Sequence, residues 1–159
     1  MCLKRKVFDQ CVLPAMTYGC ETWTLNNRLH QKLQTSQGSM ERYMLSVTRR
    51  DRKRNEWIRS QTKVTDIIYR IKTLKWKWAG HIARVRDERL TNSIINWVPL
   101  DIKRSRRMPG ARWMVEIKKY AGVRWQRKAG NRQEWWKLGV AFVQQWTDIG
   151  WWWWGWGWW

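Results

Sequence analysis

The sequence predicts an all-α fold, a small helical domain with basic loops and a disordered Trp/Gly tail. Apolar residues recur every three to four positions in several segments, as on one face of a helix. No segment alternates apolar and polar residues for long enough to indicate a sheet. The chain has 159 residues, of which 43% are hydrophobic, and this is enough for one modest core. Residues 151–159 contain only Trp and Gly and are left out of the predicted fold.

Two long helices are predicted in the first half of the chain. The first covers residues 27–47, follows an Asn that can cap it, and has the apolar positions Leu29, Leu33, Met40, Met44 and Val47. The second covers residues 65–85 and begins at Thr65, a residue type that caps helices. Its apolar stripe consists of Ile67, Ile71, Leu74, Trp78, Ile82 and Val85.

Three further helices are predicted in the second half. A short one at residues 90–97 ends before Pro99, because proline lacks the amide donor that a helix needs. Another at residues 113–120 is ended by Gly122. Asn131 and Glu134 have the spacing of a capping box and begin the last helix. Its expected buried face consists of Trp135, Leu138, Phe142 and Trp146.

The charge of the chain predicts a polyanionic partner. There are 32 Lys and Arg against 12 Asp and Glu, which gives a formal net charge of +20. Basic residues gather between the predicted helices, with net charges of +5 over 42–59, +5 over 70–89 and +9 over 103–128. One isolated cluster is explained as a solvated surface. Three clusters in one small domain favour contact with nucleic acid, either RNA, an RNA–DNA hybrid or DNA.

The acidic residues predict that the chain is not an enzyme by itself. Polymerases and most nucleases hold divalent metal with clustered carboxylates. The one adjacent acidic pair, Asp87 and Glu88, stands between Arg86 and Arg89, which favours a salt-bridged surface over a metal site. The sequence therefore predicts no catalytic residues.

The cysteines and histidines predict neither a metal site nor a disulfide framework. Cys2, Cys11 and Cys20 are nine residues apart, whereas structural zinc ligands come in pairs two to four residues apart. Cys11 and Cys20 are expected to be small buried hydrophobic residues. Three cysteines without a secretory signal, and no apolar run long enough to span a membrane, indicate an intracellular protein, nuclear or cytoplasmic, that is neither secreted nor in a membrane.

Several stretches, in one order, carry a resemblance to a known family. They are VFDQCVLPAMTYGCETWTL (7–25), MERYMLSVTRRDRKRNEWIR (40–59), TKVTDIIYRIKTLKWKWAGHIARVRDER (62–89), and then WVPLD, PGARW and AFVQQWT. Together they resemble the C-terminal part of the endonuclease–reverse transcriptases of non-LTR (LINE-type) retrotransposons. The resemblance covers roughly residues 3–148. The chain departs from the family pattern at Arg107–Gly110, at Met114–Glu116 and at Asn131.

The resemblance implies where this chain lies in an RNA-directed DNA polymerase. Residues 1–47 would be a thumb-like helical segment and residues 48–150 a basic C-terminal extension, followed by the low-complexity tail at 151–159. The palm aspartates, which hold Mg²⁺ in that family, would lie upstream, so no cofactor is expected here. The implied function is non-catalytic binding of RNA or of the RNA–DNA template–primer.

The expected nucleic-acid-binding residues are mainly arginines and lysines, because Arg bridges phosphates with two hydrogen bonds and Lys adds a point charge. They are Arg49, Arg50, Arg52, Lys53, Arg54, Lys103, Arg104, Arg106, Arg107 and Arg112. Trp76 lies off the main stripe of its helix, and we expect it either to stack on a base or to pack against a neighbouring helix. Trp78, Trp113 and Trp135 are expected in the core.

Other functions remain open at this point. One alternative is a standalone helical DNA-binding module, with the helix after Thr65 in a groove. Another is a non-functional relic of a decayed element. Binding of a membrane surface through the cationic body and the Trp/Gly tail ranks last.

Overall fold

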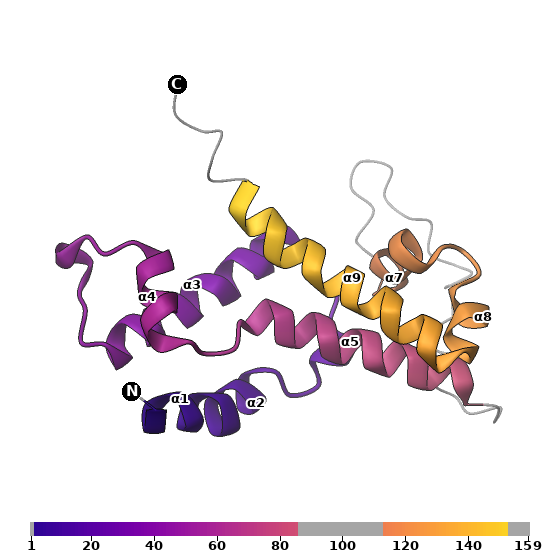
Figure 1. The fold of residues 1–159 in the computed structure, drawn as a ribbon, viewed down its shortest axis with the longest axis horizontal. Coiled ribbons are helices and arrows are strands. Elements are labelled where there is room, and N and C mark those ends of the chain that lie inside the picture. Colours follow the sequence, from indigo (N-terminus) through magenta and orange to yellow (C-terminus); the bar gives the residue numbers. More distant parts are fainter. Residues whose placement is uncertain (1, 86–112, 153–159) are drawn as a thin grey trace, which may run out of the picture. The chain divides into compact units, whose positions relative to one another are not determined.

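The structure, a computed structural model, describes residues 2–85 and 113–152, and for residues 145–152 it describes the backbone alone. Within these ranges the ordered elements are helices and no strand is present, so the predicted all-α fold is confirmed (Figure 1). The chain forms two compact units. Unit 1 comprises the described residues of Met1–Cys20 and Leu25–Ile71, and unit 2 those of Glu21–Thr24 and Lys72–Trp159. The predicted segment boundary after residue 47 lies inside unit 1.

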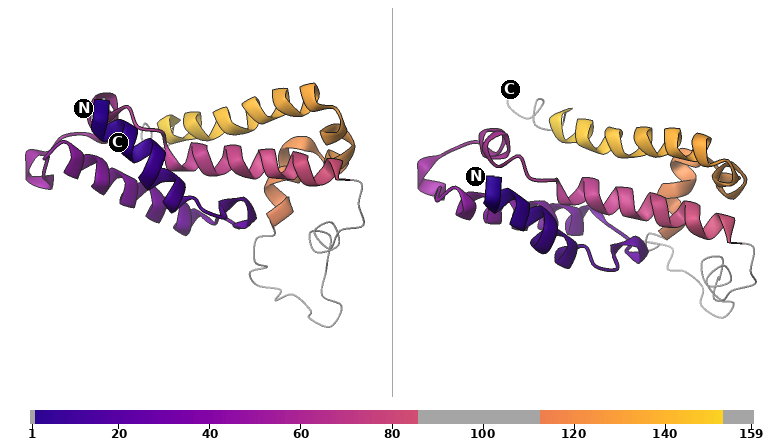
Figure 2. Two further views of the ribbon diagram at one scale, coloured as in Figure 1. Left: turned by 90° about the horizontal axis from the view of Figure 1, so that it is seen from below. Right: turned by 60° about the horizontal axis from the view of Figure 1, so that its bottom comes forward.

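Unit 1 is built from short N-terminal helices and a longer helix, α3. α1 (Cys2–Val7) continues through a π-helical turn (Phe8–Val12) into α2 (Leu13–Met16), and α3 (Asn27–Met44) is followed by α4 (Asn55–Thr62). α1 lies beside the end of α3, where Lys4 Nζ donates to the carbonyl of Met44 at 2.8 Å (Figure 2). The predicted cap of α3 is confirmed, because Asn26 Oδ1 accepts from Leu29 N at 2.8 Å.

The interior of unit 1 is partly polar. The predicted stripe of α3 is wrong at Leu29 and Met40, which are exposed, while Gln37 and Glu41 are buried. The Gln37 amide is buried because it bonds to the backbone just before and at the start of α5 (Ile67–Arg84): its Nε2 donates to Thr65 O and its Oε1 accepts from Ile67 N. Periodicity of apolar residues does not detect such a contact. The buried apolar residues of this unit are Phe8, Leu13, Cys20, Ile58, Ile67, Ile68 and Ile71.

The prediction that Cys11 and Cys20 are buried is confirmed for one of them and wrong for the other. Cys20 is fully buried, as expected, whereas Cys11 is exposed. Cys11 lies in the π-helical turn, next to the half-buried Val12 and two residues before the buried Leu13. All three cysteines are free thiols.

Unit 2 combines the larger part of α5 with α7 (Trp113–Ala121), α8 (Trp125–Gly130) and α9 (Arg132–Trp152). Gly122 ends α7 with a left-handed φ of 84°, a conformation open to glycine without strain. Asn131 caps α9 as predicted, since its Oδ1 accepts from the backbone N of Gln133 and Glu134. The predicted helix at 90–97 and the side chain of Trp146 lie outside the described residues.

The core of unit 2 is aromatic. It consists of Trp76, Ala79, Ile117, Ala121, Trp125, Ala129, Trp135, Phe142 and Val143. Trp78 and Trp113 are half-buried at its edge, where their rings meet edge to face with centroids 5.1 Å apart. The predicted stripe of α5 covers only part of the buried surface, because Trp76, Ala79 and Gly80 are buried in addition to Ile82.

Candidate nucleic-acid interface

The segment between α3 and α4, residues 45–54 (loop 45–54), carries the first group of predicted binding residues. At its beginning Ser46 is left-handed, with φ of 56°, and Val47 N donates to Arg42 O at 3.0 Å, which caps α3. At its end the Arg42 guanidinium donates to the side-chain oxygen of Asn55, the first residue of α4. Both ends of the loop are therefore fixed to helices.

The only acidic residue of loop 45–54 is used inside the loop. Asp51 Oδ2 accepts from Thr48 N at 2.7 Å and from Thr48 Oγ1 at 2.9 Å. The backbone bond first, and then the hydroxyl bond, lower the pKa of Asp51 below its usual range, so this carboxylate is ionised at neutral pH. Asp51 thus holds the short 3₁₀ turn Arg49–Asp51, and within the described residues it pairs with no arginine within 4 Å.

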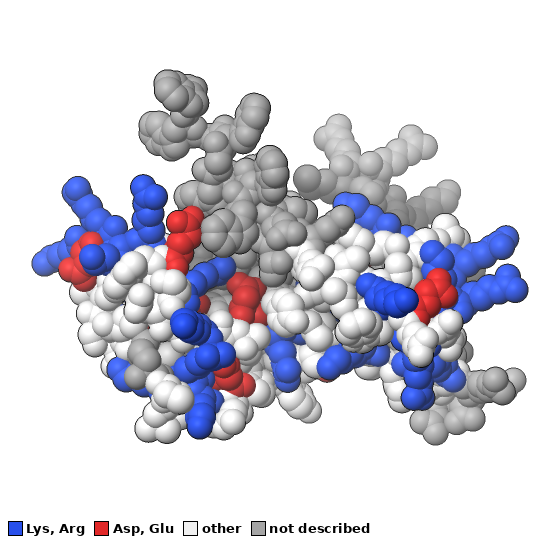
Figure 3. Space-filling view, in the orientation of Figure 1, with Lys and Arg blue, Asp and Glu red and all other residues white. Residues whose placement is uncertain are grey.

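Five cations of the loop are exposed and are in no ion pair within the described part of the chain. They are the predicted Arg49, Arg50, Arg52, Lys53 and Arg54. The other two cations of the predicted 42–59 cluster have protein partners, since Arg42 bonds to Asn55 and Arg59 pairs with Asp66 at 3.1 Å. Figure 3 shows Lys and Arg side chains projecting from the segment between α3 and α4. The N–H donors of these five side chains are therefore open to solvent, where an anion can reach them.

Trp57 is a functional candidate that the sequence analysis missed. Its side chain is 41% exposed on the first turns of α4, and Lys53 Nζ lies 5.2 Å from its ring centroid. An exposed indole beside cations is the arrangement on which a nucleic-acid base stacks. The available signal was its position, four residues after Lys53 and inside the basic run.

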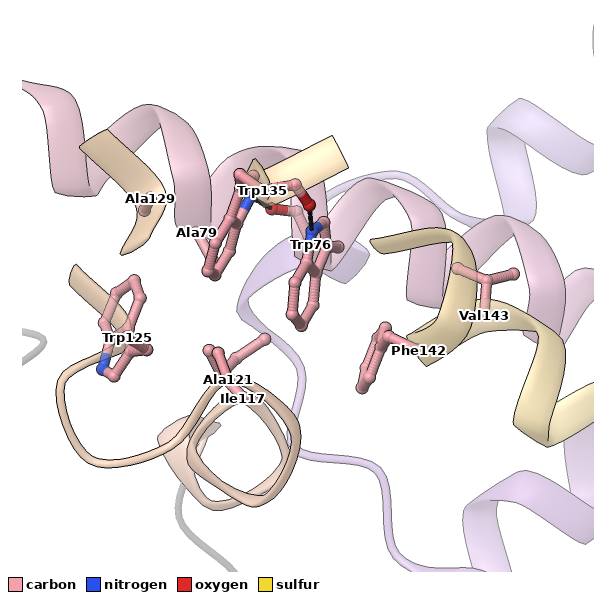
Figure 4. Packing of buried hydrophobic residues seen from close by; sticks show 9 residues of the cluster. All are labelled: Trp76, Ala79, Ile117, Ala121, Trp125, Ala129, Trp135, Phe142 and Val143. Atoms are coloured by element: carbon pink, nitrogen blue, oxygen red, sulfur yellow. Dashed lines mark hydrogen bonds between the residues drawn. The ribbon is translucent and has the colours of Figure 1, made fainter. Parts of the chain in front are cut away.

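Trp76 is not available to a base, so the prediction that it stacks on nucleic acid is wrong and its alternative, packing against a neighbouring helix, holds. It is only 4% exposed, and its ring stacks on Trp135 with centroids 4.1 Å apart and on Phe142 at 4.8 Å (Figure 4). Trp76 Nε1 donates to Trp135 O at 2.9 Å, and Trp135 Nε1 donates back to Trp76 O at 3.2 Å. These bonds satisfy both indoles inside the core.

Burial and internal pairing also reduce the number of cations that the predicted basic cluster at 70–89 exposes to solvent. Lys72 and Lys75 are buried and pair with the two carboxylate oxygens of Glu116 on α7, at 2.7 and 2.9 Å. Arg84 Nη1 donates to Ala129 O at 2.9 Å. These cations hold unit 2 together and do not present their charge to a phosphate.

The charge state of this ion-pair cluster follows from its surroundings. Burial lowers the pKa of Lys72, and the nearby Glu116 opposes that shift. Burial by itself would raise the pKa of Glu116, but the two lysines outweigh it and hold this pKa below the usual range. Glu116 is therefore the ionised member on which both lysines depend.

The second group of predicted binding residues, Lys103, Arg104, Arg106, Arg107 and Arg112, lies outside the described residues, as does the acidic pair Asp87 and Glu88. Within the described ranges, no three His, Cys, Asp or Glu side chains gather as they would around a metal ion. The helices of residues 2–85 and 113–152 include none that is both long and apolar enough for a membrane span.

Comparison with known proteins gives one relative. The chain is 33% identical, over 147 residues, to an uncharacterized transposon-derived protein of Caenorhabditis elegans. The chain is similar to a transposon-derived protein. The match covers 84% of this chain and 52% of the relative, so the chain spans about half the length of that protein. No protein-family model matches the chain, and no solved structure does.

Proposed function

We propose that this chain is a non-catalytic, nucleic-acid-binding segment of a retrotransposon reverse transcriptase, which contacts RNA or an RNA–DNA template–primer through loop 45–54. The observation that carries the proposal is the loop itself. Its five exposed cations are in no ion pair within the described residues, and its one acid is bound to Thr48.

The fixed backbone of loop 45–54 favours binding. A loop that is anchored at Arg42, Ser46 and Thr48 loses less conformational entropy on binding than a free one. Arg49, Arg50 and Arg52 would each offer a planar fork of donors to phosphate oxygens. Trp57 would add base stacking, which tolerates any sequence because every base has a flat face.

Two further points support the assignment to a reverse transcriptase. The relative is a transposon-derived protein, which agrees with the origin that the order of the sequence stretches implies. The stretches at 7–25, 40–59 and 62–89 resemble the part of the reverse-transcriptase family that follows the palm, so we propose that this segment binds and does not catalyse.

The alternative of a helix in a DNA groove is disfavoured. A recognition helix needs a face of exposed polar side chains that reach base edges. In α5 only Tyr69, Lys77 and His81 are exposed, and the buried lysines of this helix are bound to Glu116.

The test is the affinity of the full chain for structured RNA, RNA–DNA hybrid and duplex DNA, each titrated across a range of salt. Each phosphate contact contributes a slope of ~0.9 in log affinity against log salt for duplex DNA, and ~0.7 for a single strand. We expect tighter binding of RNA or hybrid than of DNA. The variant R49Q/R50Q/R52Q should lower the slope by about 2 to 3.

A matched control removes the same charge elsewhere. K6Q/R28Q/K32Q changes three exposed cations of α1 and α3 outside the loop, and it should leave the slope near that of the wild type. Equal losses in the two triple variants would mean that only net charge matters, and would contradict binding by loop 45–54.

A further inference from the structure

A second cationic surface lies on unit 2, where α8 gives way to α9. Residues 124–137 (the α8–α9 corner) have five exposed cations and one acid, Glu134, and none of these side chains is in an ion pair in the described part of the chain. The cations are Arg124, Arg127, Lys128, Arg132 and Lys137. Figure 3 shows Lys and Arg side chains gathered over α8 and the beginning of α9.

The fold brings these cations together because the corner is tight. α8 ends at Gly130 and α9 begins at Arg132, so only Asn131 separates the two helices, and its side chain is bound to the first turn of α9. Lys128 in the last turn of α8 and Arg132 in the first turn of α9 are thus separated by three residues, 129–131.

Helix stability explains only part of this charge. Cations in the last turn of a helix are favourable, which accounts for Arg127 and Lys128. Arg132 stands at the opposite end of a helix dipole, in the first turn of α9, where a positive charge is unfavourable. Its charge also acts on Arg84, whose pKa is lowered first by burial and then by Arg132. A bound anion would offset the unfavourable position of Arg132 in the helix dipole and would weaken the repulsion between Arg132 and Arg84.

An exposed indole accompanies the cations. Trp136 is 69% exposed, whereas its neighbour Trp135 is 4% exposed in the core. Trp136 follows Arg132 by four residues on α9, a spacing that places two side chains on the same face of a helix. An indole of this size is left in water although unit 2 has an aromatic core that buries three other tryptophans.

We infer that the α8–α9 corner is a second nucleic-acid-binding surface, at which the cations contact the phosphates of a single strand and Trp136 stacks on an unpaired base. The ligand class rests on the proposed function, but the residues belong to unit 2 alone. The five-to-one excess of cations favours a polyanion over an apolar protein partner. Residues Arg132 and Trp136 provide the phosphate contact and the stacking face within one helical turn.

The charge part of the inference is tested with the full chain and a fluorescein-labelled oligo(U) strand. The background is R49Q/R50Q/R52Q, so that loop 45–54 contributes little. Adding R127Q/K128Q/R132Q should lower the salt slope by about 2, since a single strand contributes ~0.7 per contact. Adding K6Q/R28Q/K32Q instead should leave the slope unchanged, and equal slopes for the two would overturn the inference.

The stacking part is tested at Trp136 in the same background. W136A should weaken binding about tenfold, which is ~1.4 kcal/mol and within the range for one stacked base. W136F retains an aromatic face and should recover most of the affinity, whereas W136L should bind like W136A. Y18A, which removes another exposed aromatic side chain, should have no effect. If W136L binds as tightly as the R49Q/R50Q/R52Q background with Trp136 intact, stacking is overturned and the contact is a plain apolar one.

The two proposals fail in different ways. If the wild-type chain binds no nucleic acid at any salt concentration, the proposed function and this inference both fall. If R49Q/R50Q/R52Q abolishes binding of oligo(U) and the α8–α9 variants change nothing in the otherwise wild-type chain, only the second surface is overturned.

Discussion

Glu41 in unit 1 and Glu116 in unit 2 are both carboxylates on helices that pack into an interior, but their partners differ. Glu41 is 1% exposed, accepts from Thr62 Oγ1 at 3.0 Å, and is in no ion pair within the described residues. Glu116 faces two lysines, Lys72 and Lys75, which are themselves buried. One carboxylate has a neutral partner and the other has more positive charge than it can balance.

The difference in partners reverses the direction in which the pKa is shifted from its usual value. Burial raises the pKa of Glu41, and the Thr62 hydroxyl and the charge of Arg59 oppose this shift without overcoming it. At Glu116 burial acts in the same sense, but the lysines lower the pKa below its usual range. The partner, more than the degree of burial, therefore decides whether a buried acid stabilises the fold as an anion.

The largest expected effect is that of Glu116→Gln. Removing this carboxylate leaves two buried ammonium groups without a counter-charge, and breaking a buried pair in this way typically costs about 3 to 5 kcal/mol. Glu41→Gln removes a carboxylate that burial disfavours, and should change the free energy of unfolding by less than about 1 kcal/mol at neutral pH. Urea denaturation of both variants measures the difference.

The variant Lys75→Met tests whether the loss in Glu116→Gln comes from unpaired lysine charge. Lys75→Met leaves one lysine for one carboxylate, so it should destabilise unit 2 less than Glu116→Gln does. Similar losses in Glu116→Gln and Glu41→Gln would show that the difference in partners has no bearing on stability.

The next effect concerns glycines in the helices of the two units. A Cβ at Gly139 would lie 2.7 Å from Cδ1 of Trp76, and one at Gly80 would lie 2.7 Å from Cδ1 of Trp135. Gly139→Ala and Gly80→Ala should therefore each destabilise the protein by about 1 to 3 kcal/mol, because the stacked rings have no room to move.

The matched control is Gly38→Ala in α3 of unit 1. There a Cβ would meet only Arg42 Nη1 at 3.5 Å, an ordinary contact with a flexible side chain. Alanine favours a helix over glycine, so we expect a gain of about 0.5 to 1 kcal/mol. Thermal and urea unfolding of the three variants tests the opposite signs, and a gain at Gly139 would contradict tight packing of Trp76.

Local signals in the sequence predicted the fold class and several helix ends. Asn26, Gly122 and Asn131 act within three or four residues of themselves, so their roles can be read without knowing the tertiary structure. The cations of loop 45–54 were predicted from charge density, a property that also needs no distant partner. Their binding of nucleic acid stays a prediction.

Contacts between distant residues were not predictable in the same way. Lys72 and Lys75 are long charged side chains of a type found mostly on surfaces, and their partner Glu116 lies 44 and 41 residues further along the chain. Trp76 and Trp135 exchange hydrogen bonds across 59 residues. Gln37 is buried by backbone groups 28 and 30 residues away. In each case a polar group is buried because its partner is present. The spacing of apolar residues along the sequence carries no information about such a partner.

The smallest expected effect is the pH dependence that distinguishes the two acids. The pKa of Glu41 is raised in the folded state, so between the unfolded value of 4.5 and the folded value the native protein binds more protons than the unfolded chain. Stability from this group is present below pH 4.5 and is lost as pH rises through that window. The pKa of Glu116 is lowered, so its contribution is present above pH 4.5 and is lost as pH falls.

The difference in unfolding free energy between wild type and Glu41→Gln isolates the first of these effects, because the other titrating groups are common to both proteins. From pH 4 to pH 7 the variant should gain stability relative to the wild type, because only the wild type loses the contribution of the Glu41 carboxyl as pH rises. Arg59 and Asp66 also act on Glu41, with opposite signs, and they are retained in the variant. A difference that stays constant across this range would mean that folding does not raise the pKa of Glu41, so that Glu41 keeps its charge when buried. Thr62 and Arg59 would then offset the effect of burial at Glu41, as the two lysines do at Glu116.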